Sequence, residues 1–154
     1  ALRLLLVTLA VTPLRAITGW RAIAPYRRSF GLCAFLYACL HLSTYLGFDL
    51  GFRFDLLGED ILERPYITVR FTAFCLLVPL AATSTRAAIR KLGKRWISLH
   101  RLVYAAAVCA VVHFFWLVKA DEREPLIYGA VLAGLLTARA VPALLRAKRR
   151  KALA

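Results

Sequence analysis

Four stretches of roughly 20 residues, each with at most one charged side chain, constrain the fold of this chain more than any other feature. A hydrocarbon core of about 30 Å is crossed by roughly 20 helical residues, and backbone polar groups in lipid must be satisfied within the segment. The sequence therefore predicts an all-α integral membrane bundle of about five transmembrane segments, the first of them partial. The expected helices cover about residues 1–14, 29–48, 66–85, 96–118 and 126–145, within a single domain over residues 1–154.

The charge distribution predicts how these helices are oriented. The chain carries 22 Lys and Arg against 8 Asp and Glu, a net charge of +14, while 61% of its residues are hydrophobic. Cytoplasmic loops of membrane proteins are enriched in Lys and Arg. The segments alternate between basic and acidic. We expect the basic ones, 15–28, 86–95 and the tail 146–154, in the cytoplasm, and the acidic ones, 49–65 and 119–125, outside.

The basic residues do not form one continuous face. They are divided among separate loops and are not interleaved with aromatic side chains on one surface. This argues against nucleic acid as a partner, and we expect membrane lipid to be the partner instead. The chain contains no methionine, even at position 1. We therefore expect a fragment or processed form whose first span begins upstream.

Three histidines, His41, His100 and His113, lie in the predicted spans, where ionisable groups are costly and usually functional. His41 precedes Phe48 by seven residues and His113 precedes Lys119 by six, on helices that run in the same direction. Both imidazoles are thus expected about 10 Å below the outer surface. Two imidazoles at one depth can fill both axial positions of a haem. A zinc site would need more ligands, and a structural hydrogen bond to a neighbouring helix is the simpler alternative.

His100 precedes His113 by 13 residues, a helical rise of about 20 Å that places it near the cytoplasmic side. The equivalent positions on the second helix hold Arg27 and Arg28, so a second haem would lack a second histidine. Three interpretations stay open: an arginine beside a haem propionate, a site with one protein ligand, or another role for His100. The same 13 residues turn a straight helix by about 220°, so His100 and His113 share a face only if the helix bends.

Several short strings in order carry a family resemblance. They are Arg27-Arg28-Ser29-Phe30-Gly31-Leu32, Tyr37, Leu40-His41-Leu42, Arg64-Pro65-Tyr66-Ile67-Thr68-Val69, Thr83-Ser84, Leu92-Gly93, Trp96, Leu99-His100-Arg101-Leu102-Val103-Tyr104, His113, Trp116 and Glu124-Pro125-Leu126-Ile127-Tyr128. In this order and spacing the chain resembles the MsrQ (YedZ) family. These are haem-binding membrane subunits within the ferric reductase and NADPH oxidase transmembrane superfamily.

The resemblance implies a six-helix cytochrome of the bacterial inner membrane with one haem b or two, and it allows an associated FMN. It implies electron transfer from the quinone pool or a cytoplasmic flavin reductase to a periplasmic molybdopterin enzyme that reduces methionine sulfoxide. By the same resemblance His41 and His113 are the axial pair of the outer haem and His100 is an inner ligand. Arg27 or Arg28 stands where the oxidases have histidine.

Two departures from the family pattern are visible. The first family helix is expected to be missing here, and Arg70 stands where the family pattern Thr-Val-Gly has a small residue. A lone arginine in the last span, Arg139, is expected to snorkel toward the basic tail, with pairing to a haem propionate as the alternative.

No Gly-rich dinucleotide fingerprint follows a strand, so we expect the electrons to come from a separate donor. We therefore expect this chain to be an electron-transfer subunit rather than the catalytic subunit. A ferric or quinone reductase with another acceptor is an alternative of the same class. A histidine-lined proton channel or transporter is the alternative from another class, but it would need acidic partners within the spans. Acidic residues of the outer loop, Glu59, Asp60 and Glu63, could dock a basic partner surface, although solvated loop acids are the commoner explanation.

Overall fold

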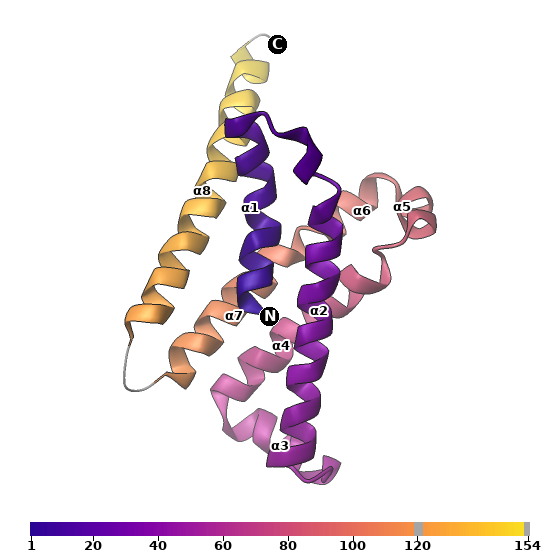
Figure 1. Ribbon diagram of the computed structural model, residues 1–154, viewed down its shortest axis with the longest axis vertical. Coiled ribbons are helices and arrows are strands. Elements are labelled where there is room, and N and C mark those ends of the chain that lie inside the picture. The colour runs from indigo at the N-terminus through magenta and orange to yellow at the C-terminus, as the bar shows by residue number, and fades with distance from the viewer. Residues whose placement is uncertain (119–121, 153–154) are drawn as a thin grey trace.

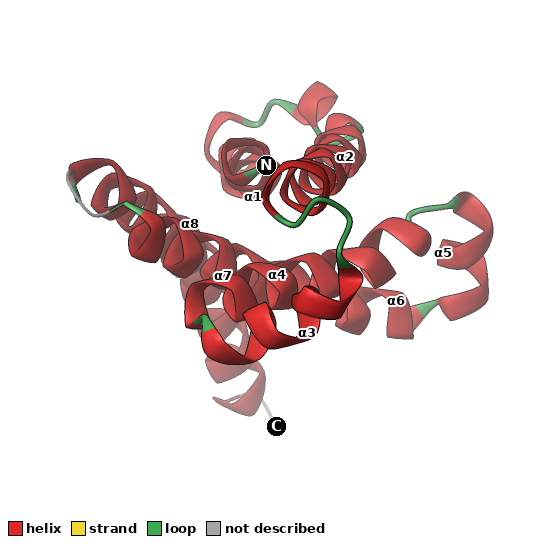
Figure 2. Ribbon diagram, turned by 90° about the horizontal axis from the view of Figure 1, so that it is seen from below, coloured by secondary structure: helices red, strands yellow, loops and turns green. Residues whose placement is uncertain are grey.

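The computed structural model describes residues 1–118 and 122–152, and every regular element in those ranges is helical (Figure 2). Four helical segments there are long and apolar enough to cross a membrane: Arg21–Asp49, Pro65–Ala82, Lys94–Leu117 and Arg123–Val141. The predicted all-α class is therefore confirmed. The elements in chain order are α1 (Leu2–Thr18), η1 (Arg21–Ile23), α2 (Tyr26–Thr44), η2 (Tyr45–Asp49), α3 (Phe54–Glu63), α4 (Pro65–Ala82), α5 (Arg86–Leu92), α6 (Lys94–Leu99), α7 (Leu102–Leu117) and α8 (Arg123–Ala152).

The bundle is built on the pair α4 and α7, which share the most extensive helix contact. Helices α1 and α2 lie side by side on one flank, and α8 packs against α1 and α7 (Figures 1 and 2). The buried core between them consists of aliphatic and small side chains. It comprises Leu5, Leu6, Leu9, Ala34, Leu77, Leu80, Val103, Ala106, Ala107 and Leu132.

Helix α1 covers only part of α2. The N-terminus of α1 lies beside the middle of α2, and the part of α2 that leads toward α3 extends past it (Figure 1). That uncovered part contains His41 and is continued by η2, a π-helical turn.

Several predicted boundaries move because local signals extend or interrupt the helices. The first helix reaches Thr18 and ends at Gly19, whose φ of 71° is the left-handed conformation that glycine adopts readily. Helix α2 already begins at Tyr26, so Arg27 and Arg28 lie in its first turn and not in the loop predicted over 15–28. Helix α4 begins with Pro65 at its first position, where a missing N–H costs nothing.

The two longer loops also contain helices. Within the predicted outer loop 49–65, α3 is amphipathic and packs its apolar side, including Leu57 and Ile61, against Tyr45 and Ile67. Within 86–95, α5 is capped by the Thr85 hydroxyl, which accepts a hydrogen bond from the Ala88 N–H at 3.1 Å. Helix α5 lies to one side of the bundle (Figure 2).

The predicted helix 96–118 is interrupted at His100 itself. Helix α6 ends at Leu99 and α7 begins at Leu102, with His100 and Arg101 in the turn between them. The straight-helix argument that set His100 and His113 on different faces therefore does not apply.

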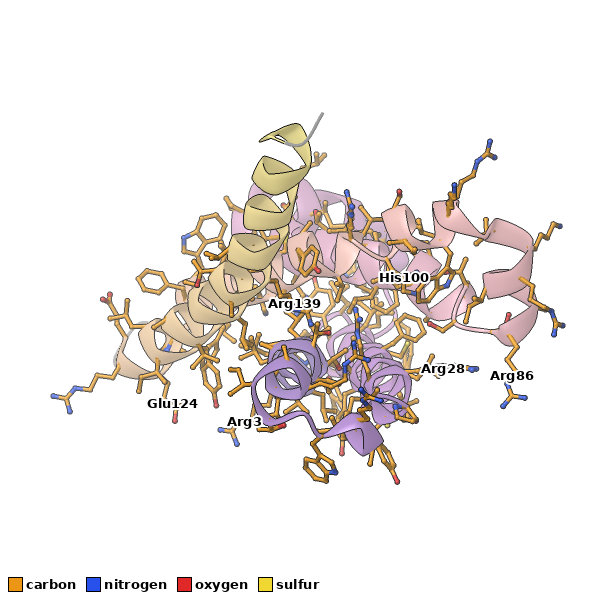
Figure 3. All side chains as sticks on the ribbon, turned by 90° about the horizontal axis from the view of Figure 1, so that it is seen from above. Arg3, Arg28, Arg86, His100, Glu124 and Arg139 are labelled. Atoms are coloured by element: carbon orange, nitrogen blue, oxygen red, sulfur yellow. The ribbon has the colours of Figure 1, made fainter. Side chains whose placement is uncertain are left out.

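The expectation that Arg139 snorkels is wrong, because its side chain turns into the bundle. Figure 3 shows Arg139 reaching from α8 toward α1. Its guanidinium donates to the Leu9 carbonyl of α1 and, at 3.0 Å, to the Tyr104 hydroxyl of α7. Four residues after Leu9 stands Pro13, which has no N–H to donate to that carbonyl. Arg139 thus satisfies a backbone oxygen that the proline leaves without its helical partner.

The proline and the arginine should therefore be energetically coupled. We expect Arg139→Leu to lower the free energy of unfolding by about 1–3 kcal/mol, since it leaves a buried carbonyl unsatisfied. In a Pro13→Ala background the same change should cost less, because the introduced alanine restores the helical N–H. Denaturation of the four proteins of this cycle in mild detergent measures the coupling. Equal penalties in both backgrounds would show that Arg139 does not serve that carbonyl.

Small side chains let α7 approach its neighbours closely. Ala106 is fully buried, whereas Ala105 on the same turn is exposed. We expect Ala106→Leu to destabilise the bundle by about 1–3 kcal/mol through overpacking. The matched control Ala105→Leu points away from the core and should stay within about 0.5 kcal/mol of the parent in the same detergent denaturation.

Candidate functional site

A large cavity of the bundle, here called the outer cavity, has a volume of about 980 Å³. It lies between α1, α2, α4, α7 and the start of α8. Its size is at the upper end of the roughly 300–1,000 Å³ typical of ligand sites. The lining is mainly apolar, and it includes both His41 and His113.

The structure brings the rings of His41 and His113 together across this cavity. Their centroids are 6.4 Å apart, and the ring planes are inclined by 57°. An imidazole nitrogen binds a metal at about 2 Å, so two rings on opposite faces of one metal have centroids about 6 Å apart. The observed separation therefore suits two axial ligands of a single iron.

A backbone carbonyl sets the tautomer of His113. Its Nδ1 lies 3.0 Å from the Tyr66 carbonyl oxygen on the first turn of α4. Because a carbonyl only accepts, Nδ1–H is the donor, and Nε2 keeps its lone pair for a metal. This is the usual way in which proteins orient histidine ligands.

The residues present fit a haem better than a bare metal ion. Over the residues that the structure describes, no three His, Cys, Asp or Glu side chains gather into a group that would hold an ion. A structural zinc site needs about four such ligands. A flat macrocycle with two axial positions needs only the two imidazoles and an apolar cavity.

A smaller inner cavity of about 260 Å³ contains the third histidine. The His100 ring stacks on Trp96 with centroids 3.8 Å apart, and its Nδ1 lies 3.2 Å from the Trp96 carbonyl oxygen. Its Nε2 is buried and makes no hydrogen bond with any residue that the structure describes. Trp96 in turn donates its indole N–H to the Thr83 carbonyl at 3.0 Å, which fixes α6 against the end of α4.

Arg27 and Arg28 both line the inner cavity together with His100. Arg27 is half-buried, whereas Arg28 is exposed and points to the side of α5 (Figure 3). Arginine offers donors and no acceptor or metal-binding lone pair at neutral pH. The inner cavity therefore pairs one free imidazole nitrogen with two cations suited to an anionic group.

The two cavities adjoin each other. Leu5 and Leu77 line both of them. Beside this boundary, Phe35 of the inner cavity stacks on Phe74 of the outer cavity with centroids 5.8 Å apart. The residues described at this boundary, Leu5, Leu77, Phe35 and Phe74, are all apolar.

Two cations of the outer cavity were not predicted as site residues. Arg70 of α4 places its guanidinium carbon 3.8 Å from the ring centroid of Tyr45. Arg3, which also lines this cavity, donates to the Tyr128 hydroxyl at 2.7 Å; Figure 3 labels its side chain. Arg70 could be recognised in the sequence as a charge inside an apolar span, but the direction of its side chain could not be predicted.

The comparisons with known proteins define the class. Residues 1–111 match the family model described as "Ferric reductase like transmembrane component". The chain therefore belongs to the ferric reductase-like transmembrane family, as the motif strings predicted.

More specific relatives place it within the MsrQ family. It is 54% identical over 136 residues to a protein of Xanthomonas campestris pv. campestris (strain 8004) named "Protein-methionine-sulfoxide reductase heme-binding subunit MsrQ". That match covers 88% of this chain and 62% of the relative. A Rhodospirillum rubrum protein of the same name is 53% identical over 143 residues, covering 92% of this chain and 69% of the relative.

The chain thus spans less than two thirds of the length of the Xanthomonas relative and slightly more than two thirds of the length of the Rhodospirillum relative. No solved structure matches it significantly.

Proposed function

We propose that this chain is part of a b-type haem cytochrome that carries electrons across the bacterial inner membrane to a periplasmic methionine sulfoxide reductase. One observation carries the proposal. It is the pair of imidazoles 6.4 Å apart across an apolar cavity of about 980 Å³. The names of the relatives, which describe heme-binding subunits of a methionine sulfoxide reductase, support the same function.

The haem, when bound, supplies a one-electron couple between ferric and ferrous iron. His41 and His113 would hold it from opposite sides through Nε2, and the Tyr66 carbonyl keeps His113 in the required tautomer. If His41 and His113 both hold the haem iron, this chain would leave it no position for a substrate. Electron transfer, rather than chemistry on a substrate, is the activity this arrangement favours.

The inner cavity is the proposed entry point for electrons. His100 Nε2 faces it as a free ligand, and Arg27 and Arg28 supply positive charge for a propionate or another anionic group. In this proposal His100 would be the one protein ligand of a second haem, and the inner cavity of about 260 Å³ would have to widen to hold it. The donor is proposed to be quinone or a cytoplasmic flavin reductase, with FMN as a further cofactor.

The proposed orientation follows the charges of the loops. Residues 15–28, 86–95 and the tail face the cytoplasm, and 49–65 and 119–125 face the periplasm. The acceptor is proposed to be a molybdopterin subunit that reduces methionine sulfoxide in oxidised periplasmic proteins. Its reduced state would be renewed by electrons that leave the His41–His113 site.

The axial pair has a direct spectroscopic test. We expect the purified protein to show reduced-minus-oxidised Soret and alpha bands of low-spin haem b, and His41→Ala or His113→Ala to remove most of that signal. Each change deletes one of two strong ligands. Ser43→Ala is the matched control, because Ser43 lies two residues from His41 and does not line the cavity. A colourless protein, or full low-spin spectra in both alanine variants, would contradict the proposal.

The inner site is tested by stoichiometry. We expect His100→Ala to lower the haem and iron content per chain while the bands of the His41–His113 site persist, because the two cavities have separate ligands. Haem extraction and iron analysis of wild type and variant measure the difference. Unchanged spectrum and stoichiometry would remove the second haem from the proposal.

A further inference from the structure

Arg70 is a cation inside a candidate membrane span. It is the sixth residue of α4, about 8 Å along the helix from Pro65, and it is half-buried. It lines the outer cavity together with both axial candidates. A charge at this position is costly unless something pairs with it.

The Tyr45 ring stacks on the face of the Arg70 guanidinium. The stacking distance is 3.8 Å, and Tyr45 itself is only 6% exposed. The Tyr45 hydroxyl donates to Asp60 Oδ2 at 2.6 Å, so α3 fixes the ring on which Arg70 rests. Stacking uses the face of the guanidinium and leaves its in-plane N–H donors for a planar acceptor such as a carboxylate.

No carboxylate of the described residues provides that acceptor. The ion pairs formed there are Arg53–Asp55 and Arg64–Asp60, and Arg70 belongs to neither. Asp60, which Tyr45 reaches, is already paired with Arg64 at 3.3 Å. Glu124 is the one acid among the described lining residues, and it forms no ion pair with Arg70.

From these contacts we infer that Arg70 binds a carboxylate of the ligand held between His41 and His113, a haem propionate, and raises the reduction potential of its iron. The inference rests on the proposed function. Uptake of one electron converts ferric to ferrous iron and lowers the charge of the site by one unit. A neighbouring cation favours the less positive state. Arg70 is therefore a positioning and tuning residue of this chain, at a place where the family pattern predicts a small residue.

The midpoint potential of the bound haem tests this role. Arg70→Gln removes the charge and keeps a polar side chain, and Arg70→Lys keeps the charge. We expect Arg70→Gln to retain low-spin bands while the equilibrium constant for reduction falls at least tenfold, which is 59 mV for a one-electron couple. Arg70→Lys should stay within threefold of wild type. Arg53→Gln is the control, because Arg53 is an exposed cation of the outer side that does not line the cavity.

The outcomes separate the two ideas. An unchanged potential in Arg70→Gln, or an equal fall in Arg53→Gln, overturns the role of Arg70, whereas unchanged spectra in the His41→Ala and His113→Ala variants overturn the proposed function itself. Where Arg70→Gln does not fold, Arg70→Lys decides. The inference is supported if the equilibrium constant for reduction in Arg70→Lys stays within threefold of wild type and Tyr45→Leu lowers the haem content. A tenfold fall of that constant in Arg70→Lys contradicts it.

Discussion

The cost of leaving a polar group unpaired in hydrocarbon determines where the functional side chains of this bundle point. Pro13 removes the helical donor of the Leu9 carbonyl, and Arg139 crosses from α8 to replace it. On the first turn of α4, the Tyr66 carbonyl accepts a hydrogen bond from His113 Nδ1 at 3.0 Å. The side chains of Arg139 and His113 therefore both face inward, and each ties two helices together. The tie at His113 has a second effect, because it presents Nε2 to the outer cavity.

Counting along the chain was sufficient to predict the main helices and to assign His41 and His113 one depth. Apolar runs bounded by charges mark spans almost directly, because the bilayer imposes one length on all of them. Two residues at equal distance from the same membrane surface then have equal depth. Depth alone does not make two rings adjacent, yet α2 and α7 both flank α4, and that arrangement brings the rings to 6.4 Å.

Features that depend on side-chain direction could not be predicted in this way. Arg70 was visible only as a departure from a pattern, since its stacking on Tyr45 requires the π-helical turn that follows α2. The inward course of Arg139 had a usable signal in Pro13, four residues after a carbonyl that needs a new donor. The break at His100 had none, because Leu99 to Leu102 contains neither proline nor glycine.

The boundary between the two cavities has an electrical consequence. Leu5, Leu77 and the stacked pair Phe35 and Phe74 separate the inner site from the outer one without an ionisable group among them. Under the proposed function, an electron crosses this boundary without a proton beside it, so its passage displaces net charge through the dielectric. A full crossing would be worth about 2.3 kcal/mol per 100 mV of membrane potential. In a cell whose interior is negative, the energised membrane itself would drive reducing equivalents outward.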